Sequence, residues 1–189
     1  MDKKKIQKAI RLFLEGIGEN PDRPELKSTP ARVAEMAVEL YAGIGKNPKE
    51  DMEVIFNQEY DELVLIRDIP LYSMCEHHLL PFMGKAHIAY IPDKNRITGL
   101  SKLARVVETL SRRLQLQERL TTQIADTIMK TLKPKGVMVV VEAEHLCMTM
   151  RGVKKPGSRA VTSVMRGIFL EDARTRNEAL NLIHKIPAL

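Results

Sequence analysis

The chain has 189 residues, of which 44% are hydrophobic, and a formal net charge of +6. That length and apolar content suit one ordinary packed domain and argue against a disordered chain. No stretch approaches the roughly 18 consecutive apolar residues of a membrane span, and the start of the chain lacks the apolar run of a secretion signal. We therefore expect a cytoplasmic protein without a membrane partner.

The two cysteines and the positive charge restrict the classes of function that the sequence allows. In a reducing cytoplasm, two cysteines are more consistent with metal binding, reactivity or burial than with a stable disulfide. The charge suits an anionic partner, either a nucleic acid or a small phosphorylated molecule, although a basic solvated surface also explains it. With four Phe, four Tyr and no Trp, few aromatic side chains are available to stack nucleic-acid bases.

The first fifty residues predict a helical arm. Apolar residues recur at helical spacing over residues 3–18. A second helix is expected to begin at Thr29, which can serve as its N-cap, with Pro30 in the first turn. We therefore divide the chain into an N-terminal helical arm, residues 1–50, and an α+β body, residues 51–189.

The body alternates pairs of strands with pairs of helices. Strands are expected at residues 63–66 (ending by Pro70), 85–91, 137–141 and 160–169, and helices at 101–114, 118–132 and from about 173. Adjacent strands joined without crossovers indicate an antiparallel sheet. The sequence therefore predicts an α+β fold with a four-stranded antiparallel sheet and two helices packed on one face.

Two short motifs, CEHH and HLC, place both cysteines beside three of the five histidines. Cys75 and His78 are separated by two residues, so one tight turn can aim both side chains at one ion. Cys147 arrives from the end of a different strand. Zinc with three such ligands keeps a fourth position open for water, which it activates near neutral pH.

The other two histidines of these motifs leave a choice open. With three ligands, His77 and His145 are free to act as general acid and base, since imidazole titrates near neutrality. All four of Cys75, His78, His145 and Cys147 could instead close a structural Cys2His2 site. Spacing alone does not decide between a catalytic and a structural metal centre.

A second set of polar residues suits an anionic substrate. Lys102 and Arg105 share one face of a predicted helix, and Ser101 lies at its start, where free backbone N–H groups favour phosphate. Arg151 follows Cys147 by four residues and can offer a phosphate bidentate contacts. Taken alone, Lys102 and Arg105 are explained more simply by a solvated charged helix face, and their weight as phosphate ligands comes from the neighbouring motifs.

Gln117 and Glu118 lie between two predicted helices. A carboxylate opposite an amide edge could accept the paired N–H donors of a guanine ring. Helix capping and first-turn dipole stabilisation explain Glu118 equally well, so the residues alone leave both interpretations open.

Together these segments resemble the zinc-dependent GTP cyclohydrolase I family. The resemblance is carried by SMCEHHLLPFMGKAHIAYIP, GLSKLARVVETLSRRLQLQERLT, VVVEAEHLCMTMRGVKKPGS and AVTSVMRGIF, and more loosely by STPARVAEM in the arm. It implies a hydrolase that converts GTP into 7,8-dihydroneopterin triphosphate and formate, the entry step to folate, and so to one-carbon metabolism, or to tetrahydrobiopterin. It also implies the tunnelling fold and a homodecamer with active sites where subunits meet.

The resemblance assigns roles to residues of this chain. The zinc ligands that it implies are Cys75, His78 and Cys147. The groups that it implies move protons are His77, His145 and Ser101. The substrate contacts that it implies are Gln117 and Glu118 for guanine, Lys102, Arg105 and Arg151 for the ribose and triphosphate, and Arg32 from a neighbouring subunit. Glu35 stands where some members of the family carry a lysine.

Two alternatives remain at this stage. Another enzyme of the same fold, such as a pterin synthase or the nitrile reductase of queuosine synthesis, should carry an all-histidine zinc set or a lone nucleophilic cysteine, and neither matches CEHH with HLC. A nucleic-acid-binding module with structural zinc would use the charge, but it gives no role to Gln117 and Glu118.

Overall fold

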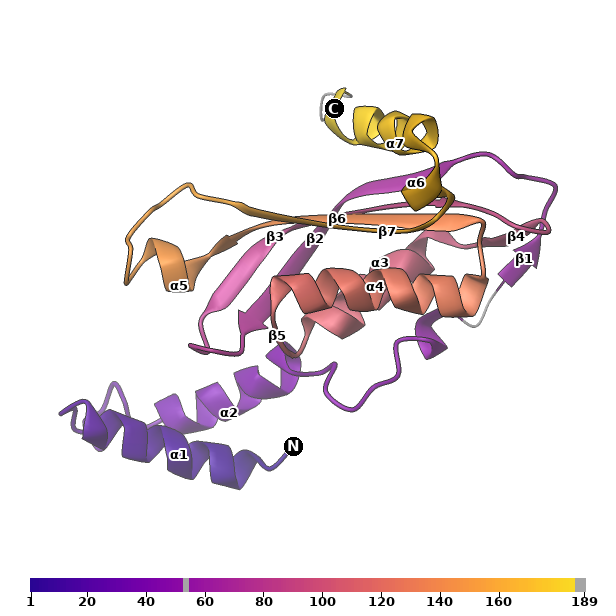
Figure 1. The fold of residues 1–189 in the computed structure, drawn as a ribbon. Helices are drawn as coiled ribbons and strands as arrows, with labels where there is room; N and C mark the ends of the chain where they lie inside the picture. The colour runs from indigo at the N-terminus through magenta and orange to yellow at the C-terminus, as the bar shows by residue number, and fades with distance from the viewer. Residues whose placement is uncertain (53–54, 186–189) are drawn as a thin grey trace.

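The computed structural model describes residues 1–52 and 55–185. These residues form, in chain order, α1 (Lys3–Gly16), α2 (Thr29–Leu40), the 3-10 helix η1 (Glu50–Met52), β1 (Ile55–Asn57), β2 (Val64–Cys75), β3 (Pro81–Ile91), β4 (Arg96–Thr98), α3 (Leu100–Ser111), β5 (Leu114–Gln115), α4 (Gln117–Leu132), β6 (Gly136–His145), α5 (Leu146–Thr149), β7 (Ala160–Gly167), α6 (Ile168–Glu171) and α7 (Ala173–Lys185). Figure 1 shows a sheet with helices on both faces and a helical pair, α1 and α2, that extends to one side. In the described part of the chain, no helix is long and apolar enough to cross a membrane.

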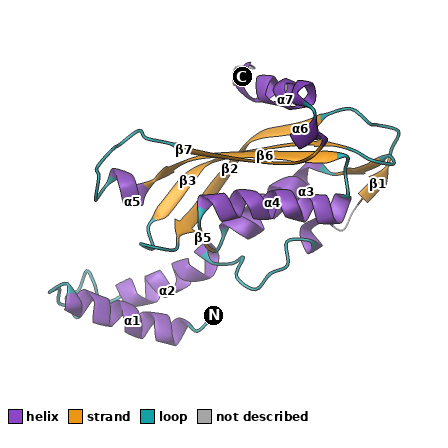
Figure 2. Ribbon diagram, viewed as in Figure 1, coloured by secondary structure: helices purple, strands orange, loops and turns teal. Residues whose placement is uncertain are grey.

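The central sheet has five strands in the order β5-β2-β3-β6-β7 (Figure 2). From β2 to β7 the neighbouring strands are antiparallel, whereas the two-residue β5 pairs parallel with the end of β2. The predicted α+β class is confirmed, and the predicted four-stranded antiparallel sheet is corrected to a mixed sheet of five strands. Two residues between helices are too few to show an alternating pattern, so sequence periodicity cannot reveal β5.

Strand β2 runs past Pro70, where the sequence predicts its end. Its register with β3 shifts between Ile66 and Ile69, a bulge at which Asp68 has a φ of 59°. Pro70 is tolerated because β2 has only β3 as a neighbour until its last two residues. The longer strand ends at Cys75, so the CEHH motif lies in a tight turn rather than in an open loop.

The main core lies between the sheet and helices α3 and α4. The predicted apolar helix faces are confirmed, because Leu103, Val107, Ile124 and Ile128 are all fully buried there. Each such side chain stabilises the fold by about 1.5–3 kcal/mol relative to exposure. Leu114, expected at the end of the first helix of this pair, lies instead in β5 and is partly exposed, because the helix ends at Ser111.

A second, smaller core lies on the opposite face of the sheet. Ala89 of β3 and Met138 of β6 pack there against Phe169, Ala179 and other residues of α6 and α7. The two predicted helices do pack on one face, but the C-terminal helix covers part of the other face. The position of α7 above the sheet is visible in Figure 1.

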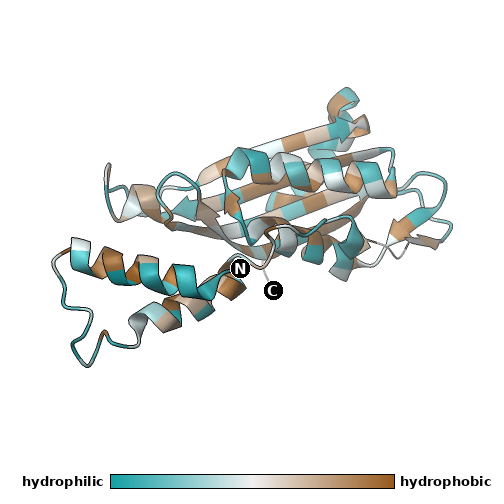
Figure 3. Ribbon diagram, turned by 90° about the horizontal axis from the view of Figure 1, so that it is seen from below, coloured by the Kyte–Doolittle hydropathy of each residue, from teal (hydrophilic) through white to brown (hydrophobic). Residues whose placement is uncertain are grey.

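The arm consists of α1 and α2, which pack side by side. The second helix has Ser28 as its N-cap residue, rather than the predicted Thr29, and Ser28 makes no side-chain capping bond. Apolar residues of α1 and its C-cap remain outside this contact, because Leu12, Phe13 and Ile17 are each more than half exposed. Figure 3 shows apolar segments along the arm interspersed with polar ones. The predicted domain division at residue 50 stays a prediction.

Candidate metal centre and substrate site

The CEHH motif forms the turn that joins β2 to β3. The Cys75 N–H donates to the Leu80 carbonyl at 2.9 Å, and the Leu79 N–H donates to the Cys75 carbonyl at 2.9 Å. Leu79 adopts a φ of 53°, which closes the turn. Cys75 is therefore buried at the end of the strand, while His77 and His78 are exposed at the tip.

Cys147 reaches the same turn from the other hairpin of the sheet. Strand β6 ends at His145, opposite Phe82 of β3, and the short helix α5 then carries Cys147. One ligand atom from each of Cys75, His78 and Cys147 lies within 4.8 Å of the other two. Both cysteines are free thiols, as expected from the sequence. Among the described residues, this is the grouping of side chains that can hold a metal ion.

The chemistry of the three side chains fits zinc. Two thiols and one imidazole are the donor types that zinc prefers, and three protein ligands leave room for a further one. Burial raises the pKa of the Cys147 thiol, and the neighbouring Cys75 raises it further. A bound cation would reverse that effect by stabilising both thiolates. The residues present therefore match the metal that the sequence predicts.

His145 lies beside this group but is not part of it. Its Nε2 lies 2.7 Å from Oε1 of Gln117, and its ring stacks on Phe82 with centroids 4.6 Å apart. Burial lowers the pKa of His145, while the nearby Glu118 carboxylate raises it. This arrangement favours three metal ligands over the closed four-ligand alternative, because His145 is not among the side chains whose ligand atoms lie within 4.8 Å of one another.

Glu76 fixes the CEHH turn to helix α4. Its N–H donates to the Gln115 carbonyl at 3.1 Å, and its carboxylate forms an ion pair with Arg119. The Arg119 Nε donates in turn to Oε1 of Gln115 at 3.0 Å. The hydrogen bond from Arg119 holds the pKa of Glu76 below its usual range. Sequence reasoning gave Glu76 no role, although it stands inside the motif; Arg119 and Phe82 offered no signal.

The predicted guanine and phosphate residues divide into two groups. Gln117 and Glu118 open α4 beside His145, and the charge of Arg151 acts on the Cys147 thiol. These three therefore lie with the metal ligands. The side-chain amide of Gln117, however, is engaged inside the protein, whereas Glu118 is exposed.

The remaining anion-binding candidates lie away from the metal ligands of the same chain. The last residue of α3, Ser111, accepts the Ser73 hydroxyl near the end of β2, so the far end of α3 carries Ser101 and Lys102. At 1.5 Å per residue, about 15 Å of helix separates Ser101 from Ser111. Arg105 lies one turn along and is exposed.

Arg32 lies in the first turn of α2 in the arm and is also exposed. Glu35, where some members of the family carry lysine, accepts Lys3 Nζ at 2.6 Å. In this chain the arm therefore presents a carboxylate, already paired with Lys3, one turn beyond Arg32.

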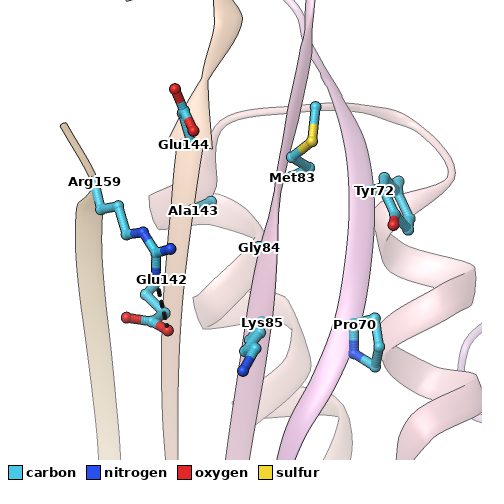
Figure 4. Close-up of a pocket in the computed structure, with 9 residues that line it drawn as sticks. All are labelled: Pro70, Tyr72, Met83, Gly84, Lys85, Glu142, Ala143, Glu144 and Arg159. Atoms are coloured by element: carbon cyan, nitrogen blue, oxygen red, sulfur yellow. Dashed lines mark hydrogen bonds and ion pairs between the residues drawn. The ribbon is translucent and has the colours of Figure 1, made fainter. Parts of the chain in front are cut away.

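A cavity of about 310 Å³ lies elsewhere, on the face of the sheet opposite α3 and α4. Its lining residues, shown in Figure 4, are Pro70, Tyr72, Met83, Gly84, Lys85, Glu142, Ala143, Glu144 and Arg159. None of the candidate metal ligands lines it. The size of a cavity is therefore a poor guide to the chemistry of this molecule.

Comparison with known proteins agrees with this geometry. The family model described as GTP cyclohydrolase I matches residues 6–184. A protein of Pelotomaculum thermopropionicum named GTP cyclohydrolase 1 is 63% identical over 182 residues, covering 96% of this chain and 97% of its own. Proteins of the same name from Carboxydothermus hydrogenoformans and Clostridioides difficile are 63% and 60% identical, and cover 99% and 97% of this chain and 98% and 97% of their own.

Similarity to solved structures is lower. The apo structure of an archaeosine synthase QueF-Like protein covers 56% of this chain and 93% of its own at 17% identity, with a TM-score of 0.46, too low to bear on function. The family model and the relatives instead extend over nearly the whole chain. The chain belongs to the GTP cyclohydrolase I family.

Proposed function

We propose that this protein catalyses the hydrolytic opening of the guanine imidazole ring of GTP, with release of formate and formation of 7,8-dihydroneopterin triphosphate. Family membership and the names of its relatives establish the GTP cyclohydrolase activity. The observation that supports the site is the grouping of Cys75, His78 and Cys147 with His145 beside them. The nucleic-acid module and the other enzymes of the fold lose their support, because the family match spans residues 6–184.

Zinc, when bound by the two thiolates and the imidazole, supplies Lewis-acid chemistry and activates water at neutral pH. His145 has its ring held by Phe82 and Gln117, so it is oriented to deliver a proton to a ring nitrogen of guanine. His77, exposed at the tip of the same turn, and Ser101 serve the later proton transfers during ribose opening and ring closure. These roles follow the family pattern and remain proposals.

Substrate recognition is assigned to the charged groups around the centre. The Glu118 carboxylate accepts N–H donors of guanine and rejects adenine, which would leave the carboxylate opposite the wrong donor pattern. Arg151, Lys102 and Arg105 contact the triphosphate and ribose, with Arg32 from the arm of another chain. Because Ser101 and Lys102 lie far along α3 from the metal ligands of their own chain, we propose that each site forms where two copies meet.

The proposed assembly is the homodecamer of the family, working in the cytoplasm, with folate or another pterin as the downstream product. The exposed apolar residues of α1 are consistent with contacts between copies. A long sheet edge at β7 also suits ring closure, because closed sheets remove edges that would otherwise aggregate.

The deciding experiment measures GTP turnover and metal content together. The zinc-loaded protein should release formate and yield a pterin that fluoresces after oxidation. His145→Ala should lower turnover by at least about 10²-fold, the usual contribution of a general acid. The variant should still bind one zinc per chain. His184→Ala, an exposed histidine of α7, is the matched control and should keep full activity. Loss of zinc in His145→Ala would instead support a closed four-ligand site.

A further inference from the structure

The side chain of Gln117 is buried and its amide is surrounded by the protein. Only 2% of Gln117 is exposed. Its Nε2 lies 3.0 Å from the Val141 carbonyl, 3.0 Å from the Ala160 carbonyl and 3.2 Å from Oγ1 of Thr162. Its Oε1 lies 2.7 Å from His145 Nε2. Every polar atom of this side chain therefore has a partner within the protein.

The two peptide carbonyls settle which way the amide points. A carbonyl oxygen only accepts hydrogen bonds, so the NH2 of Gln117 must face Val141 and Ala160. The amide oxygen then faces His145, and it also only accepts. His145 Nε2 must therefore carry a hydrogen and donate it to Gln117.

Two threonines reinforce this orientation. Thr121 Oγ1 donates its single hydrogen to the main-chain carbonyl of Gln117 at 2.7 Å, so in its 2.6 Å contact with Thr162 Oγ1 the donor must be Thr162. The lone pairs of Thr162 are then free to accept from Gln117 Nε2, whose two hydrogens face three acceptors, so that one hydrogen is shared between Thr162 and a carbonyl. The hydrogen bonds form a closed ring that starts and ends on Gln117, and Thr121 is fully buried within it.

We infer that Thr121 and Thr162, acting through Gln117, are positioning residues that hold the His145 ring with a hydrogen on Nε2 and leave Nδ1 as the ring nitrogen available to the substrate. Nε2 keeps its bond to Gln117, and the ring stays stacked on Phe82. This inference rests on the proposed role of His145 as the proton donor.

The inference gives Gln117 a different role from the one its place in the family pattern implies. A side chain that reads guanine should affect substrate binding, whereas one that orients His145 should affect the chemical step. These two roles separate in kinetics, because loss of binding raises KM and loss of a transition-state interaction lowers kcat.

The test compares Thr162→Val, Thr162→Ser and Gln117→Met in the zinc-loaded protein. Thr162→Val removes the hydroxyl at nearly constant shape and should lower kcat about threefold to tenfold, the value of one hydrogen bond, with KM for GTP unchanged. Thr162→Ser restores the hydroxyl and should recover wild-type kcat. Gln117→Met should lower kcat by about 10²-fold, again with KM unchanged.

A spectroscopic measurement gives a readout that is independent of turnover. In protein labelled with 15N-histidine, the resonances that disappear in His145→Ala belong to His145. They should show the Nε2–H tautomer in the wild type and in Thr162→Ser, and a mixture of tautomers in Gln117→Met.

The matched control is Thr127→Val. Thr127 is also a buried threonine of α4 that donates to the carbonyl four residues earlier, but it lies outside the ring, so its kcat should equal that of wild type. A raised KM at unchanged kcat in Gln117→Met, or an Nδ1–H tautomer in the wild type, would overturn the inference. Absence of GTP turnover by the wild type would instead refute the proposed function, while the tautomer measurement would still test the ring.

Discussion

Individual residues of this chain act through charge or through close approach of backbones. The exposed Arg105 illustrates the first, because its guanidinium has no role in the core and its proposed role is contact with phosphate. Gly84 illustrates the second. It pairs with Ala143 across β3 and β6, where the two backbones leave no room for a side chain.

Arg105→Ala should weaken the binding of GTP far more than the binding of guanosine. Hydrogen bonds to a charged group contribute about 1.5–3 kcal/mol, which corresponds to roughly tenfold to hundredfold in KM for GTP. Inhibition by guanosine should stay unchanged, because guanosine carries no phosphate. Lys130→Ala, which removes an exposed charge from α4, is the control. Equal losses for GTP and guanosine would refute the phosphate role of Arg105.

Gly84→Ala should destabilise the sheet. A Cβ at this position would lie 1.9 Å from the Glu142 carbonyl oxygen, so the strands must move apart, at a cost of about 1–3 kcal/mol or more. At Gly16, at the end of α1, no atom lies within 4 Å of an added Cβ, so Gly16→Ala should not destabilise the fold. The measurement is urea unfolding of both variants, and similar midpoints would contradict the close packing of β3 and β6.

Among the elements, α7 depends on one carboxylate for its start. Asp172 immediately precedes the helix and accepts the Arg174 N–H, the Thr175 N–H and the Thr175 hydroxyl, the last at 2.7 Å. These hydrogen bonds, led by that of Thr175, lower the pKa of Asp172 to about 2. The helix in turn covers the second core of the sheet, and Arg67 donates to the Ile183 carbonyl near its end at 3.3 Å.

This depressed pKa predicts a pH dependence of stability. The folded-state pKa of about 2 lies below the ordinary value of 3.8. The ionised carboxylate therefore contributes stability that is fully present above the unfolded pKa and is lost as the pH falls through the folded pKa. The difference in unfolding free energy between wild type and Asp172→Asn should be constant from pH 7 to 5 and shrink below about pH 4. Urea unfolding across that range checks it, and a difference that grows on acidification would contradict it.

At the scale of the whole molecule, one chain holds the candidate metal ligands and the proposed phosphate residues of α3 at separate places. The candidate metal ligands lie at the β2–β3 turn and on α5, elements that Figure 1 labels. Ser101 and Lys102 lie at the end of α3 remote from Ser111, which contacts β2. The arm also exposes apolar side chains that nothing in the same chain covers among the described residues. Both features point to function in an assembly of copies, which remains a proposal.

Mixing two impaired variants, assayed at GTP concentrations well below the KM of Arg105→Ala, tests whether sites are shared. His145→Ala removes the proton donor and Arg105→Ala weakens phosphate binding, so each variant alone should be impaired. If the two residues of a site come from different chains, co-assembled equal amounts should regain about one quarter of wild-type sites by random pairing. If both residues come from one chain, mixing should restore nothing beyond the average of the two variants. Turnover after joint refolding is the measurement.

The sequence by itself determined the three side chains that the structure groups as candidate metal ligands, and most of the element pattern. Periodicity predicted α3 and α4 because their apolar faces repeat every three or four residues, and the CEHH and HLC motifs identified Cys75, His78 and Cys147 through the donor types that zinc requires. It failed where pairing between distant segments decides the outcome. The bulge that carries β2 past Pro70 and the two-residue β5 depend on a neighbouring strand, which local pattern does not encode.

Only the tertiary structure decided how His145 is held. Its partners Phe82 and Gln117 come from β3 and α4, and the ring that orients Gln117 includes Thr162 of β7. Hydrogen-bond direction depends on which acceptors surround an amide, and those acceptors lie as many as 45 positions away in the chain. The sequence could name a histidine beside the candidate metal ligands, but the folded sheet alone determines which of its two nitrogens is bonded to Gln117.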